Sequence, residues 1–154
     1  MKNQTDSQLD YLRVPPHSVE AEQSVLGGLL LDNAAWERIT DVVNEEDFYR
    51  FDHKLILHHI ARLITLSRPA AVVTVHESIA SAGKSEEVGG LSYLNALAHN
   101  TPSAANIRRY AEIVRERSML RKLVSVADEI AATAFNPDGK EARQLLDEAE
   151  SKVF

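Results

Sequence analysis

The sequence predicts an all-α protein, with a compact multi-helix head followed by a long antiparallel helical hairpin. Apolar residues recur at alternating spacings of three and four between residues 104 and 135, as in a helix that packs along one face. Helix-breaking residues separate the apolar segments before it, at Pro15-Pro16, Ser67-Arg68-Pro69 and Thr101-Pro102. Val72-Val73 is the best candidate for the start of a strand, and it is too short to form one.

The hairpin is predicted from three consecutive segments: a long arm at residues 104–135, a turn at Asn136-Pro137-Asp138-Gly139 and a return helix at residues 140–154. In the turn, proline ends the first helix, aspartate caps the next and glycine accepts a positive φ angle. An arm of about 32 residues would be roughly 48 Å long, more than a small head can cover. The alternative is an ordinary buried helix in a bundle.

Two apolar rows run along the long arm. The first row, which we call the seam, consists of Tyr110, Ile113, Arg117, Leu120, Val124, Ala127, Ala131 and Ala134. The second row consists of Ile107, Val114, Leu123, Val126 and Ile130. The return helix has one stripe, formed by Ala142, Leu145, Leu146, Ala149 and Val153. We expect this stripe to cover the seam and a second copy of the chain to cover the second row, with self-association through Leu123, Val126 and Ile130.

The head, at residues 14–102, is predicted to contain about five helices. Ser18 is the expected N-cap of the first helix. Asp32 or Asn33 should cap the second, which carries Trp36, Ile39 and Val43. The pair Gly27-Gly28 predicts close approach of a neighbouring helix, because glycine disfavours a helix interior by up to about 1 kcal/mol.

The later head helices are also predicted from their ends. Asp52 is expected to open the third helix, just after a loop whose two aromatic residues should turn inward, Phe48 and Tyr49. Thr74 and Glu77 have the spacing of a capping box for the fourth, which should end at Gly83. A short fifth helix carries Leu91, Leu94 and Leu97.

The composition is that of a globular chain. Hydrophobic residues make up 44% and charged residues 26% of the 154 residues, which allows a packed core. Cysteine is absent, which excludes disulfides and thiolate metal sites, and the net charge of −6 argues against direct DNA binding. No apolar run approaches the ~18 residues of a membrane span. Residues 1–13, a predicted flexible tail, lack the apolar core of a signal peptide, so we expect a cytoplasmic protein.

One stretch, Ala82-Gly83-Lys84-Ser85, resembles the end of a phosphate-binding P-loop. That motif needs a glycine five residues before the Gly-Lys pair, where this chain has Ser78. The acidic pair Glu86-Glu87 follows and would repel a phosphate. We therefore expect a helix C-cap followed by a solvated loop, no cofactor and no ATP hydrolysis by this chain.

The histidines do not have the spacing of a metal site. His53 lies five and six residues before His58 and His59, and neither spacing places two imidazoles on one helix face. His76-Glu77 begins like a zinc-protease helix motif, but residue 80 is alanine. We expect surface or partly buried histidines and no metal ligands.

The remaining charged residues are expected to have structural roles. Asp47 and Asp52 could form a carboxylate pair, but both lie at helix starts and are better explained as caps, so no catalytic residue is predicted. The first two-thirds of the long arm is rich in basic residues, namely Arg108, Arg109, Arg115, Arg117, Arg121 and Lys122. Such a segment can meet an acidic partner, but more often forms a solvated face. Arg117 is the exception because it falls on the seam.

Three stretches carry a family resemblance. They are residues 15–27 (Pro-Pro-His-Ser-Val-Glu-Ala-Glu-Gln-Ser-Val-Leu-Gly), Asp47-Phe48-Tyr49 with His53, and residues 106–117 (Asn-Ile-Arg-Arg-Tyr-Ala-Glu-Ile-Val-Arg-Glu-Arg) through to 146–150 (Leu-Asp-Glu-Ala-Glu). Together they resemble the N-terminal domain of the bacterial replicative DNA helicases of the DnaB family, over roughly residues 13–154. The family usually carries an aspartate near Ala71, so the local geometry there is expected to differ.

The resemblance implies a function that periodicity does not. Such domains look like a helical head with a dimerising hairpin, and three dimers form the collar of a hexamer. The resemblance also implies docking of the C-terminal domain of primase in the primosome during DNA replication, and a helicase loader as a further partner. ATP and Mg would act only in a RecA-like ATPase domain outside this chain. The alternative is an unrelated helical dimerisation adaptor with no replication role.

Within the hairpin, apolar side chains near the turn at residues 136–139 are the predicted docking site for primase. They are Phe135, Leu145 and Leu146, with Phe135 as the best single anchor. A plug that closes the hairpin end is an equal alternative for Phe135. The loop at residues 84–90 offers only Val88 and would lose entropy on ordering.

Overall fold

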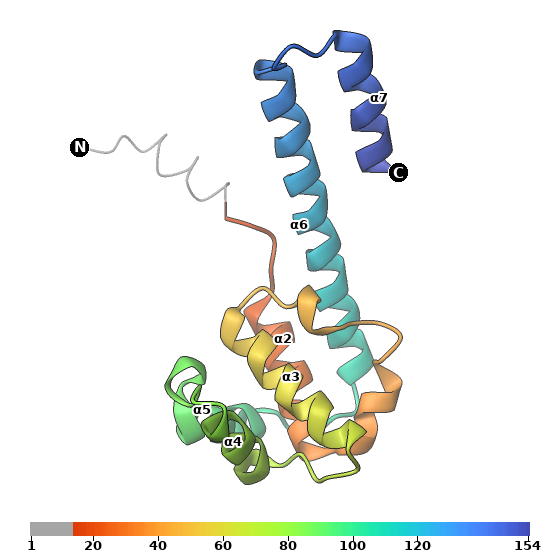
Figure 1. Ribbon diagram of the computed structural model, residues 1–154. Helices are drawn as coiled ribbons and strands as arrows, with labels where there is room; N and C mark the ends of the chain where they lie inside the picture. Colours follow the sequence, from red (N-terminus) through yellow and green to blue (C-terminus); the bar gives the residue numbers. More distant parts are fainter. Residues whose placement is uncertain (1–13) are drawn as a thin grey trace, which may run out of the picture. The chain divides into compact units, whose positions relative to one another are not determined.

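The computed structural model describes residues 14–154, and within them it consists of α-helices and short 3-10 helices with no strand, as expected (Figure 1). The predicted tail at residues 1–13 lies outside the described residues. The chain forms two compact units. The head unit is His17–Ser118, and the hairpin unit is Met119–Phe154 together with residues 14–16. No helix in the described part is long and apolar enough to cross a membrane.

Four helices form the frame of the head unit, and each packs against two of the others (Figure 1). They are α2 (Val19–Leu31), α3 (Phe51–Thr65), α4 (Val72–Ser81) and α5 (Gly90–Asn100). The 3-10 helices are η1 (Asn33–Arg38), η2 (Glu45–Asp47) and η3 (Glu86–Val88). Fully buried side chains from these elements fill the core, among them Leu26, Phe48, Ile56, Ile79 and Leu94.

The long helix α6 (Ile107–Phe135) begins inside the head unit. Ile107, Ala111 and Val114 are buried there, at the spacing of one helix face. The division between the two units therefore falls within α6, after Ser118, and not at the predicted boundary between residues 102 and 103. The first turns of the arm belong to the core of the head.

The expected features of α2 are confirmed. The Ser18 hydroxyl accepts a hydrogen bond from the Ala21 amide at 3.2 Å, as an N-cap should. A Cβ atom at residue 27 would collide with the Thr101 hydroxyl and the Leu97 carbonyl oxygen. Gly27 thus permits the close approach of α5 that the Gly27-Gly28 pair predicts.

The second predicted helix is a 3-10 helix of six residues that ends before Val43. Asp32 caps it by accepting from the Ala34 amide at 3.1 Å. Asn33 instead joins distant backbone: its amide group donates to the Leu29 and Ala70 carbonyls at 2.8 and 2.9 Å and accepts from the Ala70 amide. The chain after η1 forms turns, which bury both Ile39 and Val43.

The predicted capping box at Thr74 and Glu77 is wrong, because the N-cap of α4 is Ala71, three residues before Thr74. The Thr74 hydroxyl accepts from the Ala71 amide at 2.9 Å and donates to the Pro69 carbonyl at 2.8 Å. Thr74 is therefore the third residue of the helix and reaches back to the cap residue, whose own side chain cannot complete the box. The helix ends as predicted, with Gly83 at φ 73°.

A buried carboxylate, Glu22 on α2, holds the start of α3. It is 1% exposed and accepts from the Tyr49 and Arg50 amides at 2.8 and 3.4 Å and from His53 Nδ1 at 2.8 Å. Arg50, the N-cap of α3, makes no cap bond with its own side chain, and Asp52 is the second helical residue rather than the cap. Glu22 thus caps α3 from another helix.

The same network reaches α5. His53 Nε2 lies 2.6 Å from the Tyr93 hydroxyl, which also accepts from Gln23 at 3.2 Å. Because a carboxylate can only accept, the Nδ1 atom of His53 donates to Glu22, and the Nε2 atom bonds to the Tyr93 hydroxyl. The expectation of surface or partly buried histidines is wrong for His53 and His59, which are both buried. Helix spacing could not show this for His53, because its partner Glu22 lies 31 residues away in sequence.

Glu22→Ala should lower the free energy of unfolding by about 3 kcal/mol or more, because three donors lose a buried acceptor, each at about 1–3 kcal/mol. Urea unfolding followed by the fluorescence of Trp36, the single tryptophan, measures this change. Glu20→Ala, on the exposed side of the same helix, is the matched control and should stay within about 0.5 kcal/mol. Equal losses in the two variants would contradict the capping role of Glu22.

Ala71→Asp should raise the free energy of unfolding by about 1 kcal/mol, because an aspartate N-cap completes the capping box with Thr74. The same urea experiment measures it. Ala80→Asp places the same carboxylate on the exposed last turn of α4, where the helix dipole disfavours it, and should be destabilising. A loss of stability in both variants would show that the missing side-chain cap at residue 71 does not lower the stability of α4.

Candidate functional site

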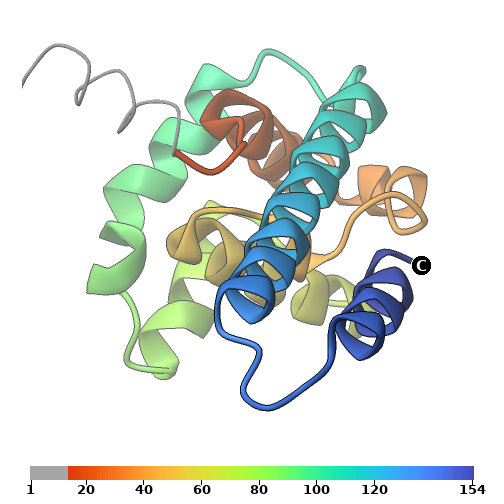
Figure 2. The ribbon, with the colours of Figure 1, turned by 90° about the horizontal axis from the view of Figure 1, so that it is seen from above.

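The predicted hairpin is present, with α6 as a helix of 29 residues and α7 (Ala142–Val153) as the return helix (Figure 1). Figure 2 shows the connecting segment bowing outward between the two helix ends. Asp138 and Gly139 have positive φ angles of 52° and 81°, so the chain reverses at the predicted turn. Asp138 does not cap α7, whose N-cap is Glu141 without a side-chain bond.

An ion pair links the two helices of the hairpin unit. Lys152 Nζ on α7 lies 2.9 Å from Glu129 Oε1 on α6. Val126, one turn before Glu129 on the helix surface, is half-buried, and so is Ile130, one turn after Val126. The side of α6 that holds the second row is thus the side nearer to α7.

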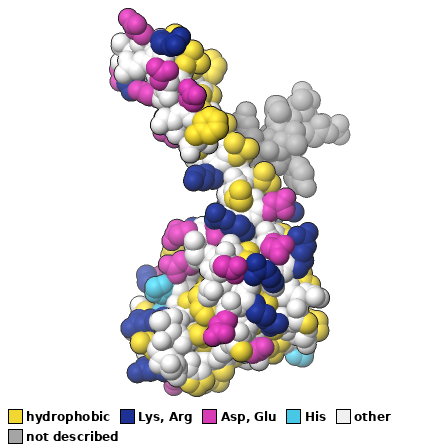
Figure 3. Space-filling model, turned by 90° about the vertical axis from the view of Figure 1, so that its right-hand side faces the viewer, with side chains coloured by type: hydrophobic (Ala, Val, Ile, Leu, Met, Phe, Trp, Pro, Cys, Tyr) yellow, Lys and Arg dark blue, Asp and Glu magenta, His cyan; other side chains and the backbone are white. Residues whose placement is uncertain are grey.

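The seam, which we expected α7 to cover, is exposed throughout the hairpin unit. Leu120 is 40% exposed, Val124 47% and Leu123, from the second row, 60%. We call this surface the seam face and define it as Leu120, Leu123, Val124, Ala127, Ala131 and Ala134, all of which are exposed. Figure 3 shows hydrophobic side chains following one another on the visible side of the hairpin unit. The expectation that α7 covers the seam is therefore wrong in this part of the helix, and self-association through Leu123, Val126 and Ile130 stays a prediction.

The predicted docking residues differ in exposure. Phe135 is 91% and Leu146 66% exposed, while Leu145 is half-buried. A plug at the hairpin end would be buried, so the exposure of Phe135 favours the docking interpretation. Val88, in the competing loop, is fully buried and offers no apolar surface to a partner.

Two of the basic residues on α6 pair with acids in other parts of the head unit. Arg108 forms two hydrogen bonds with Asp41, at 3.1 and 3.2 Å, and these hold the pKa of the Asp41 carboxyl below its usual value. Arg115 and the Ser118 hydroxyl both donate to Asp47 at 2.8 Å. The expected solvated face therefore accounts for only some of these residues, and Arg117 remains half-buried beside Glu116 at 3.8 Å.

The other residues considered for chemistry have local structural partners. Asp47 completes a capping box with Asn44, because the backbone N–H of Asn44 donates to the Asp47 carboxylate at 2.9 Å. Lys84 pairs with Glu87 at 3.3 Å, and the Ser85 hydroxyl lies 2.9 Å from His76 Nε2, so the P-loop-like stretch is the expected helix C-cap and loop. Within residues 14–154, no three His, Asp or Glu side chains are grouped as metal ligands would be.

Comparisons with known proteins agree on one family. Residues 14–116 match the family model of the DnaB-like helicase N-terminal domain. The replicative DNA helicase DnaB of Haemophilus influenzae is 44% identical over 150 residues, which is 97% of this chain and 32% of that protein. The chain thus spans about a third of the length of this curated relative.

Solved structures give the same result. The crystal structure of the N-terminal domain of DnaB helicase from Mycobacterium tuberculosis has a TM-score of 0.86 at 33% identity, covering 91% of this chain and 98% of that chain. The N-terminal domain of DnaB helicase from Helicobacter pylori, described with its interactions with primase, has a TM-score of 0.67 at 24% identity. It covers 83% of this chain and 98% of that chain, and supports the fold alone.

Proposed function

Since this chain belongs to the family of DnaB-like helicase N-terminal domains, we propose that it is the assembly and docking domain of a hexameric replicative DNA helicase. It self-associates through the hairpin into dimers, and three dimers form a collar. The collar binds the C-terminal domain of primase in the primosome, in the cytoplasm, during DNA replication. The alternative of an unrelated dimerisation adaptor is set aside by the 44% identity over nearly the whole chain.

The observation that carries this proposal is the exposed seam face of α6. It continues the row of Tyr110 and Ile113, which are partly buried against the core of the head unit, yet nothing in the described chain covers it. Its alanines let a second helix approach closely, and its leucines supply apolar area to bury. A continuous apolar stripe on a long helix is the kind of surface that a second copy covers.

The chemistry of the helicase is assigned in this proposal to another part of the protein. The matched region is the N-terminal domain of relatives about three times as long. ATP and Mg would bind in a RecA-like ATPase domain, and the present residues would contribute assembly, primase docking and contacts with a helicase loader. They would make no direct contact with DNA, in keeping with a net charge of −6.

The double variant Val124→Glu/Ala131→Glu should turn the dimer into a monomer, because it buries two carboxylates in an apolar interface. Light scattering after gel filtration at micromolar concentration measures the mass. The double variant Ser125→Glu/Ala132→Glu is the matched control: it lies one residue further along, about 100° around the helix, at exposed positions. It should remain dimeric.

A wild-type chain that is monomeric at high micromolar concentration would refute the assembly proposal. Val126→Glu/Ile130→Glu tests the residues first predicted from the sequence. If this variant dissociates the dimer and the seam-face variant does not, the second row forms the interface after all.

Phe135→Ala should weaken binding of the primase C-terminal domain by about 10-fold or more, because an exposed aromatic beside a turn is a typical interface anchor. Calorimetric titration measures the dissociation constant. Val73→Ala, which removes a 62% exposed side chain from α4, is the control and should leave the affinity unchanged. Val88→Ala is unsuitable as a control because Val88 lies in the core.

The outcome separates docking from assembly. Because Phe135 lies outside the seam face, Phe135→Ala should keep the mass of the wild-type chain. Leu146→Ala should weaken primase binding in the same direction. An unchanged affinity in both variants would place the primase site elsewhere on the domain.

A further inference from the structure

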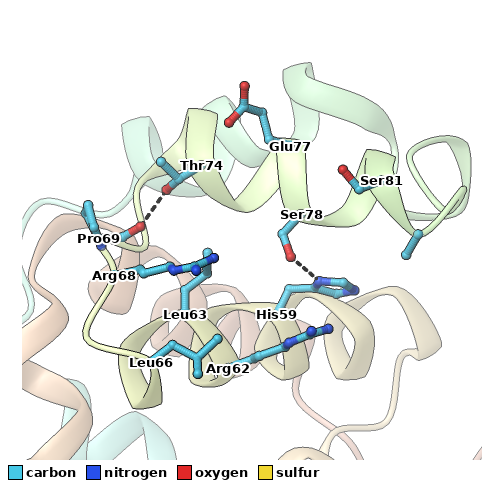
Figure 4. A pocket seen from close by; sticks show the side chains of 11 residues that line it. His59, Arg62, Leu63, Leu66, Arg68, Pro69, Thr74, Glu77, Ser78 and Ser81 are labelled. Atoms are coloured by element: carbon cyan, nitrogen blue, oxygen red, sulfur yellow. Dashed lines mark hydrogen bonds between the residues drawn. The ribbon is translucent and has the colours of Figure 1, made fainter.

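A groove of about 540 Å³ lies between α3 and α4 on the head unit (Figure 4). Its apolar lining comes from Leu63, Leu66, Pro69 and Ala82. Its polar lining includes Arg62, Arg68 and the hydroxyl groups of Ser78 and Ser81. None of the groove residues takes part in the assembly or the primase docking proposed above.

The end of α3 determines where the two arginines lie. Ser67 has a φ angle of 57°, and its amide donates to the Ile64 carbonyl at 2.9 Å while the Arg68 amide donates to the Leu63 carbonyl at 2.8 Å. These two bonds form a Schellman motif, which reverses the chain and returns Arg68 to the last turn of α3. Figure 4 shows the side chains of Arg68 and Arg62 extending along the groove.

Neither arginine has a partner among residues 14–154, because no carboxylate oxygen lies within 4.0 Å and no hydrogen bond is made by either guanidinium group. The arginines at the start of α6 differ in this respect, since Arg108 and Arg115 are paired. Glu77 is the one carboxylate that lines the groove, and its side chain points away from it (Figure 4).

His59 forms the inner wall and adds no charge at neutral pH. Its side chain is buried, and its Nδ1 atom lies 2.7 Å from the Ser78 hydroxyl. Burial, followed by the nearby charges of His58 and Arg62, lowers the pKa of His59 below its usual value. The two arginines therefore supply the positive charge of the groove.

We propose that this groove binds an acidic peptide segment of a partner protein, with carboxylates on Arg62 and Arg68 and an aliphatic side chain against Leu63 and Leu66. Paired arginines suit carboxylates because the guanidinium group donates two parallel hydrogen bonds. The chain carries a net charge of −6, so an acidic segment is repelled elsewhere and favoured at this site.

A peptide fits the groove better than a nucleotide does. Among the described residues, no Phe, Tyr or Trp lines it, and the one imidazole, that of His59, is buried, so a base would have little stacking surface, while the groove offers aliphatic side chains. The Thr74 hydroxyl bonds to Ala71 and Pro69, and the Ser78 hydroxyl bonds to His59, which leaves Ser81 to meet a polar group of the peptide.

Fluorescence polarisation with a labelled peptide Asp-Glu-Leu-Leu-Glu-Asp tests the proposal at low ionic strength. Arg62→Gln/Arg68→Gln should weaken binding at least 10-fold. Lys84→Gln/Arg109→Gln removes two exposed positive charges elsewhere on the head unit and should weaken it less than 2-fold. Leu66→Ser, at a 53% exposed position, should also weaken binding, and added salt should weaken it further.

The peptide series identifies the occupant. The amide analogue Asn-Gln-Leu-Leu-Gln-Asn should not bind, and Asp-Glu-Gly-Gly-Glu-Asp should bind more weakly. Equal binding of the amide analogue, or equal binding to the Lys84→Gln/Arg109→Gln and Arg62→Gln/Arg68→Gln variants, would overturn the proposal. Displacement of the peptide by equimolar inorganic phosphate would reduce the groove to a general anion site and would overturn it as well.

The mass of Arg62→Gln/Arg68→Gln by light scattering distinguishes a partner from a second copy. The variant should keep the wild-type mass, because the seam face and not the groove is proposed to hold the dimer. A lower mass would show that a second copy occupies the groove, which overturns the assignment to a partner protein and leaves primase docking untouched.

Discussion

The carboxylate of Glu22 is the interaction on which the head unit depends. It lies on α2, accepts from the two amides that precede α3 and from His53, and through His53 reaches Tyr93 on α5. A buried carboxylate is costly unless its acceptor positions are filled, and here three donors fill them. One side chain therefore fixes where α3 begins and how α2, α3 and α5 are oriented to one another.

The position of α3 is linked to two further features of the head unit, the contacts of Asp47 with α6 and the placement of Arg62 and Arg68. Immediately before it, η2 presents Asp47, which receives Arg115 and Ser118 from α6 at 2.8 Å and so holds the long helix to the head. One helix length later, the Schellman motif at Ser67 places Arg62 and Arg68 beside α4. Both features are set by a helix whose first residue is fixed from α2.

Local patterns in the sequence were enough to predict most of the helices and the hairpin turn, because each depends on neighbours within one or two turns. The role of Gly27 was predicted from the unfavourable place of glycine in a helix, although its neighbours Leu97 and Thr101 are distant in sequence. The sequence did not show that His53 is buried, since its partner Glu22 lies 31 positions away and helix spacing tests only nearby residues. The Thr74 and Glu77 pattern failed for a related reason. Threonine serves equally well as a cap or as the third residue of a helix, and the preceding Pro69 decides between them.

The exposure of Val88 and of the seam could not be read from the sequence either. Val88 lies among charged residues and glycines, yet η3 turns it into the core. The seam has one periodicity from Tyr110 to Ala134, but its surroundings change where α6 leaves the head unit. Hydrophobic spacing predicts that a helix has an apolar face, but it does not predict what covers that face.

The two ends of α6 show how composition separates these cases. In the head unit, the buried positions Ile107 and Val114 are β-branched and pack against a fixed core. In the hairpin unit, Ala127, Ala131 and Ala134 lie on a different face of the helix, the seam, and each exposes little apolar area, which limits the cost of the uncovered state. Alanine also loses no side-chain entropy when a second helix covers it. A face that alternates between free and covered states is best built from such residues, with Leu120 and Leu123 providing the gain on burial.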